Sequence, residues 1–190
     1  MASRNDSPAP AYRIRTHRPG DMGMIVSQHG SLYADEFGWG PDFEASTARI
    51  VADFLDNFDP ALERVFMAES TETSTFLGCI ACLKHREEPD TALLRLFLVN
   101  PSARGMGLGA RLIDDCLSFA RERGYAKIVL WTFSVLEGAR RLYRRVGFQL
   151  VFTGEEKGYW GTINLVPERW DLTLSSGEEK TAQVTVVALD

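Results

Sequence analysis

Residues 93–117 read LLRLFLVNPSARGMGLGARLIDDCL. The apolar run over 93–99 is closed by Asn100-Pro101, and three alternating glycines then lead into a helical pattern that begins at Ala110. Strand, glycine turn and helix together favour anion binding, because a backbone without Cβ atoms passes close to a ligand. The N–H groups of the turn and of the first helical turn point at one spot. We therefore predict a pyrophosphate-binding loop to which Arg104 adds a positive charge.

The glycine loop differs from two better-known phosphate loops. No Lys-Ser or Lys-Thr pair follows the glycines, which excludes a Walker loop. The glycine spacing lacks the wider second gap of the dinucleotide fingerprint, and no acidic residue closes a second strand about 20 residues further on. The loop therefore predicts a phosphate-bearing ligand of another kind.

The bulk properties indicate one soluble, cytoplasmic domain. The chain has 190 residues, of which 45% are hydrophobic and 25% charged, and its net charge of -5 argues against a general nucleic-acid binder. No apolar run approaches the roughly 20 residues that span a bilayer. Residues 1–10 are polar, lack the centre of a signal peptide and are expected to be a disordered tail. We place the domain at 11–176, and 177–190 form a C-terminal tail or an extra strand.

Three cysteines, Cys79, Cys82 and Cys116, suit a reducing compartment. The first two have the spacing of a redox or metal motif, but they lie in an apolar run that reads as a buried strand. Positions i and i+3 of a strand face opposite sides, so the two sulfurs should diverge. We expect core cysteines and no metal site.

Apolar periodicity predicts a mixed α/β (α+β) domain with a central sheet of about seven strands and four main helices. Residues 93–99 and 127–132 flank the glycine-loop helix, so they should lie side by side in parallel. If they splay at their C-terminal ends, unpaired backbone groups line a slot there. Residues 184–189 form either a further short strand or a tail. The expected strands are 12–15, 64–68, 75–84, 93–99, 127–132, 148–152 and 170–174, and the expected helices are 22–37, 43–58, 110–123 and 137–146.

Residues 94–150 resemble the GNAT family of acetyl-CoA-dependent N-acetyltransferases. The resemblance is carried by Leu98-Val99-Asn100-Pro101, by Arg104-x-x-Gly107-x-Gly109, and by Ala139-x-x-Leu142-Tyr143 followed by Gly147-Phe148. Residues 18–39 are similar to a bacterial branch in which the acetyltransferase is often fused behind a MarR-type winged-helix regulator. This chain is too short to carry that regulator.

The resemblance implies how acetyl-CoA is held. Main-chain N–H groups of the glycine loop would bind the pyrophosphate. The central strands would be splayed, and the end of the strand at Leu98 and Val99 would pair with the pantetheine arm. Relatives often carry an Asn after the next strand, where Ser134 is the nearest polar substitute here. The implied coenzyme-binding residues are Leu98, Val99, Arg104, Gly105, Met106, Gly107, Leu108, Gly109, Ala110 and Ser134.

Tyr143 is the predicted catalytic residue, because a phenol can donate a proton to the departing thiolate. The general base stays open, since many relatives place a Glu near the start of the strand that here reads Ala92-Leu93-Leu94. Glu36 belongs to an aromatic and acidic cluster that suits a substrate pocket, Tyr33, Glu36, Phe37 and Trp39. The candidate bases are Glu36, Asp35, His29, Glu87, Glu88 and a chain of waters.

We therefore expect acetyl transfer to a primary amine of a small molecule, an amino acid or a peptide, by direct attack in a ternary complex rather than through Cys116. The acidic balance mildly favours a cationic or amphipathic amine. A non-catalytic acyl-CoA sensor is the alternative, and a transcription-linked interaction domain ranks last. We expect no nucleic-acid or membrane partner, and a homodimer through the C-terminal strands stays open. The basic residues 140, 141, 144 and 145 either reach the coenzyme or form a solvated face.

Overall fold

A computed structural model describes residues 11–160 and 163–174. Its sheet has seven strands in the order β1-β2-β3-β4-β5-β9-β6, and β7 and β8 form a separate hairpin. Four α-helices occur in these described residues, so the predicted seven strands and four helices are confirmed. The elements are β1 (Tyr12–Thr16), α1 (Asp21–Phe37), α2 (Pro41–Asp56), β2 (Arg64–Ser70), β3 (Phe76–Lys84), β4 (Thr91–Val99), the 3₁₀ turn η1 (Pro101–Ala103), α3 (Leu108–Glu122), β5 (Lys127–Phe133), α4 (Glu137–Val146), β6 (Gln149–Thr153), β7 (Lys157–Tyr159), β8 (Ile163–Leu165) and β9 (Pro167–Thr173).

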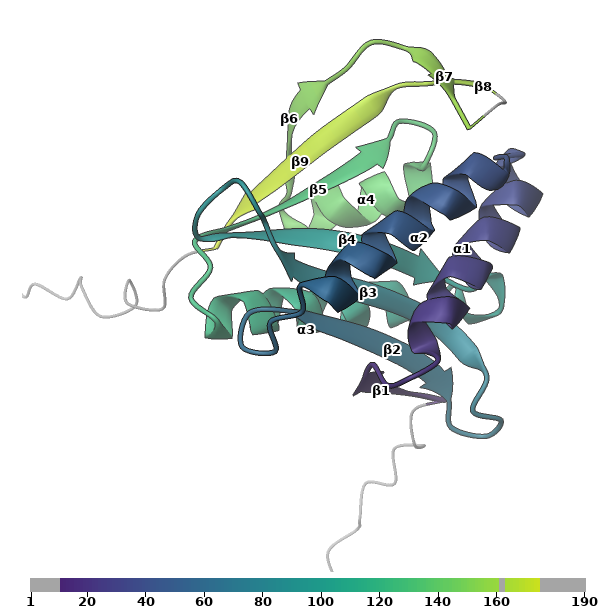
Figure 1. Cartoon of the computed structure of the whole chain (residues 1–190), viewed down its shortest axis with the longest axis vertical. Helices are drawn as coiled ribbons and strands as arrows, with labels where there is room; N and C mark the ends of the chain where they lie inside the picture. Colours follow the sequence, from purple (N-terminus) through teal and green to yellow (C-terminus); the bar gives the residue numbers. More distant parts are fainter. Residues whose placement is uncertain (1–10, 161–162, 175–190) are drawn as a thin grey trace, which may run out of the picture.

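Helices cover both faces of the sheet (Figure 1): α1 and α2 lie over one face, and α3 and α4 lie over the other. Each face therefore has its own apolar core. Cys79 is buried in the core under α1 and α2, whereas Cys82 and Cys116 are buried in the core under α3 and α4. The predicted divergence of Cys79 and Cys82 is thus confirmed.

The two central strands separate as they approach the glycine loop. β4 and β5 pair in parallel only from Thr91–Leu94 to Lys127–Leu130, although both strands continue beyond this point. The register of β4 against β3 also shifts by one residue opposite Ile80, and Leu96 has a φ of 52° there. The predicted splay is confirmed, and a β-bulge in β4 accompanies it.

Several boundaries differ from the sequence-based expectation. The helix expected at 43–58 spans Pro41–Asp56, because Pro41 fits the first turn of a helix. The strand expected at 170–174 begins at Pro167. The β7–β8 hairpin was missed, since strands of three residues are too short to show a period of two. The tails 1–10 and 177–190, including the strand considered at 184–189, lie outside the described residues.

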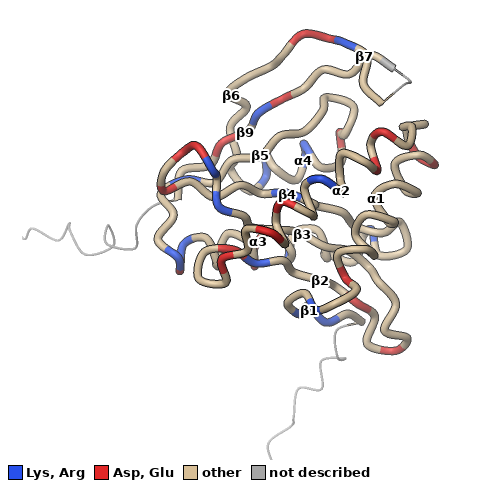
Figure 2. Tube along the Cα trace, viewed as in Figure 1, with Lys and Arg blue, Asp and Glu red and all other residues tan. Residues whose placement is uncertain are grey.

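Charges of both signs are interspersed along the chain (Figure 2). Within the described residues, no helix has the length and apolar character that a membrane crossing requires.

Candidate active site

The loop before α3 uses glycine where only glycine is unstrained. Gly105 has a φ of +82°, and Gly107, the residue that caps the N-terminus of α3, has a φ of +78°. Side-chain-bearing residues rarely adopt this left-handed conformation. The first helical bond of α3 runs from the N–H of Arg111 to the carbonyl of Gly107 at 3.1 Å. The N–H groups of residues 108–110 therefore precede the helical ladder, and they form an anion-binding helix end.

A groove of about 950 Å³ opens at this helix end. Its walls come from α1, the end of β4, the glycine loop and the start of α4. This volume lies in the range of cofactor sites. Met106 and Ser134 do not line the groove, and the N–H of Ser134 instead donates to the carbonyl of Val166 at 3.0 Å. The predicted coenzyme-binding residues in its wall are Leu98, Val99, Arg104, Gly105, Gly107, Leu108, Gly109 and Ala110.

The backbone of Val99 faces the gap between β4 and β5. Leu98 lies opposite Cys79 on β3, and the N–H of Asn100 donates to the carbonyl of Leu77 at 2.8 Å. Backbone groups of an antiparallel strand point alternately toward and away from the partner strand. Leu98 and Asn100 therefore bond to β3, and the N–H and C=O of Val99 point into the splay.

Arg104 and Glu36 meet across the groove. Nη2 of Arg104 lies 2.7 Å from Oε1 and 2.9 Å from Oε2 of Glu36. Both carboxylate oxygens of Glu36 thus bind a guanidinium. This arrangement is better suited to positioning Arg104 than to accepting a proton as a general base. Tyr33 and Phe37 line the same groove, and burial raises the pKa of Tyr33 to about 12.

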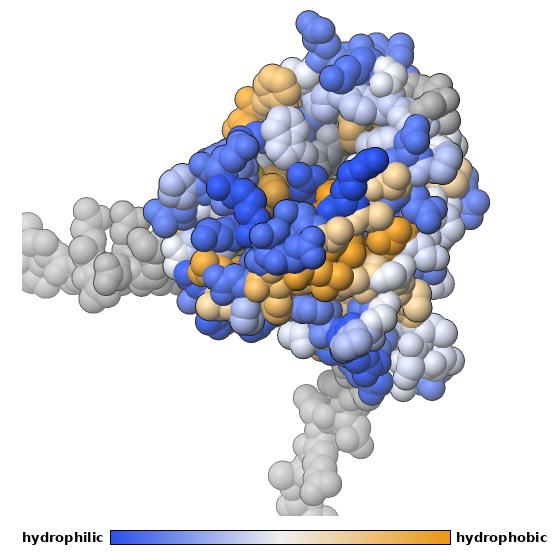
Figure 3. Space-filling view, in the orientation of Figure 1, coloured by the Kyte–Doolittle hydropathy of each residue, from blue (hydrophilic) through white to orange (hydrophobic). Residues whose placement is uncertain are grey.

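A second, smaller cavity of about 270 Å³ adjoins the groove. It lies between α2 and the strands β5 and β9, where the surface is hollowed (Figure 3). Aromatic rings dominate its wall, and the ring centroids of Trp39 and Trp160 are 4.4 Å apart. Tyr33, Phe97, Leu136 and Ala139 line both spaces, so the groove and the cavity are contiguous. The aromatic residues in the wall are Tyr33, Trp39, Phe43, Phe97, Trp131, Phe133, Tyr143 and Trp160.

Sequence reasoning found only part of this wall. Tyr33, Trp39 and Tyr143 were predicted site residues and His29 a candidate base. The lining residues that were not predicted are Arg95, Trp131, Phe133 and Trp160. These residues come from β4, β5 and the hairpin that was missed, and no short-range motif joins them. The signal available was the cluster of aromatic residues at 131–133 and 159–160.

Tyr143 lies on α4 in the wall of the cavity and is 4% exposed. Its hydroxyl has no hydrogen-bond partner among the described residues, and burial raises its pKa well above the ordinary value. The phenol is therefore neutral and keeps its proton at physiological pH. A neutral hydroxyl beside the coenzyme groove is able to donate to a negative sulfur.

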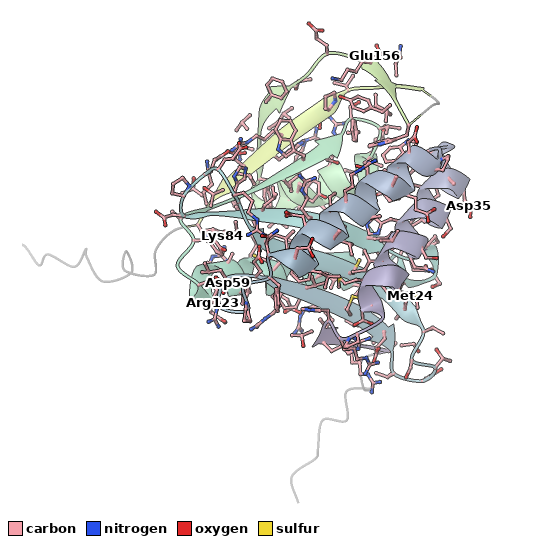
Figure 4. All side chains as sticks on the ribbon, in the orientation of Figure 1. Met24, Asp35, Asp59, Lys84, Arg123 and Glu156 are labelled. Carbon is pink, nitrogen blue, oxygen red and sulfur yellow. The ribbon has the colours of Figure 1, made fainter. Side chains whose placement is uncertain are left out.

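The structure separates the candidate bases. His29 lines the cavity, its Nδ1 lies 2.9 Å from the carbonyl of Ile25, and burial lowers its pKa to about 4. The imidazole is thus neutral at pH 7, with its lone pair on Nε2. Glu88 pairs with Arg169 and Lys127, which lowers its pKa to about 2 and takes it out of consideration as a base. Asp35 and Glu87 are exposed, and Asp35 lies on the outer side of α1 (Figure 4).

The basic run on α4 divides between two roles. Nε of Arg140 lies 3.0 Å from Oε2 of Glu168, a carboxylate that is 3% exposed. Arg144 lies over the ring of Trp170 at 5.2 Å. Arg141 and Arg145 line the groove, where they offer positive charge to a phosphate.

Known proteins match both the sequence and the fold. Residues 30–148 match the model of the Acetyltransferase (GNAT) family. An uncharacterized N-acetyltransferase of Schizosaccharomyces pombe is 29% identical over 68% of this chain and 75% of its own length. N-acetyltransferase 8F1 of Rattus norvegicus is 33% identical over 52% of this chain, which spans 45% of that protein. Mycothiol acetyltransferase of Mycobacteroides abscessus is 29% identical over 64% of this chain and 41% of its own length.

Solved structures share the architecture. A putative acetyltransferase from Salmonella typhimurium, determined with acetyl-CoA, has a TM-score of 0.70 and 19% identity and covers 91% of this chain and 99% of its own. Spermidine N-acetyltransferase from Vibrio cholerae, in complex with CoA and spermine, has a TM-score of 0.64 and 18% identity over 87% of this chain and 97% of its own. At these identities the structural likeness concerns the fold. The family match spans more than half of the sequence, and the chain therefore belongs to the Acetyltransferase (GNAT) family of acetyl-CoA-dependent enzymes.

Proposed function

We propose that this enzyme transfers the acetyl group of acetyl-CoA to a primary amine of a small molecule, an amino acid or a peptide, by direct attack within a ternary complex. The observation that carries this proposal is the junction of two spaces. A groove with a phosphate-binding helix end meets an aromatic cavity, and Tyr143 lies in the cavity wall. The coenzyme fits the groove, the amine fits the cavity, and the thioester belongs where the two spaces meet.

Each side chain then has a defined task. The glycine-loop N–H groups, with Arg104, Arg141 and Arg145, bind the coenzyme phosphates. The N–H of Val99 donates to the thioester oxygen and stabilises the charge that develops there. The amine nitrogen forms a bond to the acetyl carbon, the C–S bond breaks, and Tyr143 donates its hydroxyl hydrogen to the departing sulfur.

The amine must lose a proton to become nucleophilic. No Asp or Glu is present among the described residues that line the cavity. We infer that the amine reacts in its neutral form and that water carries its proton away, while Nε2 of neutral His29 accepts a hydrogen bond. The rate should therefore rise with pH up to the pKa of the acceptor amine. Cys116 takes no part, because it is fully buried in the core under α3, and a hydrogen bond with Cys82 together with burial raises the pKa of its thiol.

The test measures released thiol and acetylated product after purified protein is incubated with acetyl-CoA and a panel of primary amines. Turnover of at least one amine, with loss of rate in Tyr143→Phe, supports the enzyme. Tight acetyl-CoA binding without turnover of any amine would instead favour the non-catalytic sensor. Two finer points stay predictions: the likeness of residues 18–39 to the MarR-fused branch, and dimerisation through the C-terminal strands.

A further inference from the structure

The aromatic cavity contains one unusual residue. Among the described residues that line it, Arg95 on β4 is the single Lys, Arg, Asp or Glu. His29 in the same wall is neutral, because burial lowers its pKa to about 4. The cavity thus has a local positive charge although the chain as a whole is acidic.

The guanidinium of Arg95 has no partner in the part of the chain that the structure describes. Neither an ion pair nor a hydrogen bond joins it to any residue in 11–160 or 163–174, and burial lowers its pKa with no acid to compensate. Arg140 offers the contrast, because it is also partly buried but pairs with Glu168 and with the carbonyl of Ser134. A desolvated charge without a partner is costly, so the arrangement indicates a group that arrives from outside.

The strand pairing explains how Arg95 reaches the cavity, because Arg95 lies opposite Ala81, a residue of the core under α1 and α2. Before the bulge Leu93 packs on the α1–α2 side of the sheet, and after it Leu96 and Leu98 pack on that side. The alternation of the strand therefore slips by one residue between Arg95 and Leu96, and both side chains face α1 and α2. Ordinary alternation from Leu93 thus turns Arg95 to this side, and the bulge redirects Leu96 and the residues that follow it.

A second donor in the same wall also lacks a partner. Trp39 lines the cavity, and its indole N–H is buried without a hydrogen-bond acceptor among the described residues. Unsatisfied buried donors are rare in native proteins. Together, Arg95 and Trp39 make this wall rich in donors, and the aromatic rings around them suit an apolar group.

We propose that the acceptor is a primary amine that also carries a carboxylate, such as an amino acid with an apolar or aromatic side chain, and that Arg95 binds this carboxylate. The inference rests on the proposed acetyl transfer. The carboxylate pairs with the guanidinium, the apolar side chain packs on the rings, and the amine faces the junction with the groove. This replaces the expectation of a cationic acceptor that net charge suggested, because a second positive charge would be repelled by Arg95.

The experiment compares amino acids with their carboxamides. Acetylation rates are measured for L-phenylalanine, L-methionine, L-leucine and L-tryptophan and for the matching carboxamides. The rates are expressed per concentration of neutral amine, because the amino group of a carboxamide is less basic than that of the acid. The wild-type enzyme should prefer the acid of at least one pair by roughly 10- to 100-fold in kcat/KM. Arg95→Met should abolish this preference by raising KM for the acid, with KM for acetyl-CoA unchanged. Arg95→Lys should restore part of it.

Arg121→Met, on an exposed face of α3, is the matched control and should keep the preference. Equal use of acid and amide by the wild type, or equal losses for both in Arg95→Met, would overturn the inference while acetyl transfer itself stands. If none of these amines is acetylated, the proposed function fails for them. Calorimetric titration with the same acids and amides then tests carboxylate binding by Arg95 separately. Binding of an acid that Arg95→Met abolishes supports the inference, and absence of acid binding refutes it.

Discussion

Replacing Gly107 with alanine tests the phosphate-binding helix end directly. An added Cβ at this position would meet no heavy atom within 4 Å, so the change causes no steric clash. Its whole effect comes from the φ of +78°, which an L-residue adopts at a cost of about 1–2 kcal/mol. Gly23 in α1 provides a matched control, because its Cβ would also enter open space but its backbone is helical.

The two single-methyl changes should therefore act in opposite directions. At position 107 the strain is partly offset by the lower entropy of the unfolded chain, which leaves a net loss of about 1 kcal/mol. At position 23 alanine should stabilise the helix by about 0.5–1 kcal/mol. The difference of about 1.5–2 kcal/mol corresponds to a gap of roughly 3–8 °C in Tm for a domain of this size.

Thermal unfolding with and without acetyl-CoA separates stability from binding. Gly107→Ala should melt lower than Gly23→Ala, and acetyl-CoA should raise its Tm by less, because a relaxed φ turns the loop N–H groups away from the phosphates. Gly23→Ala should keep the wild-type ligand-induced shift. If Gly107→Ala binds acetyl-CoA with unchanged affinity and melts like Gly23→Ala, the helix end is not the coenzyme site.

Three further outcomes follow from the site. Tyr143→Phe should lower kcat by about 100-fold with unchanged acetyl-CoA affinity and Tm, since the hydroxyl bonds to none of the described residues. An unchanged kcat would remove the proton-donor role. His29 has a pKa of about 4 in the folded protein and near 6.5 in the unfolded chain, so the unfolded state binds more protons below pH 6.5. The free energy of unfolding should therefore decrease by about 2 kcal/mol when the pH is lowered from 7 to 5. Urea titrations at the two pH values should show a smaller decrease in His29→Gln. Arg140→Met leaves the Glu168 carboxylate buried without its cation and should cost roughly 3–5 kcal/mol, whereas Arg141→Met should change stability little and weaken coenzyme binding; equal effects on urea unfolding would contradict this division.

The part of the groove formed by the strand end and the glycine loop was predictable from sequence, because its residues are close together in the chain. Residues 98–110 contain the strand end, the glycine turn and the helix start, and each has a local signal in side-chain type or spacing. The parallel pairing of β4 and β5 followed from the order of elements, since a crossover helix places two strands in parallel. Their splay was implied by the family resemblance. Met106 and Ser134 were included by analogy of position, and neither lines the groove.

The cavity was not predictable in the same way. Its wall joins α1, α2, β4, β5, α4 and the β7–β8 hairpin, and the contacts between them are set by tertiary packing. Arg95 follows the alternation set by Leu93, and the strand pattern alone does not indicate that a cavity lies in front of it. Strand periodicity gives no warning of a bulge, because one inserted residue changes the side that every following residue faces.

The strand β4 therefore contributes to both the groove and the aromatic cavity. Up to Leu94, β4 is held between β3 and β5 and is fixed on both edges. Beyond that residue β4 separates from β5, and Arg95 lies in the wall of the aromatic cavity. After the bulge at Leu96, which adds one residue to β4 relative to β3, the backbone of Val99 faces the groove. Arg95 and the backbone of Val99 lie within five residues of one strand. The distance between the acceptor carboxylate and the thioester is therefore set by a rigid strand rather than by a loop. An acceptor that places its amine at another distance from its carboxylate should therefore bind through Arg95 and yet react slowly, which would appear as a loss in kcat at unchanged KM.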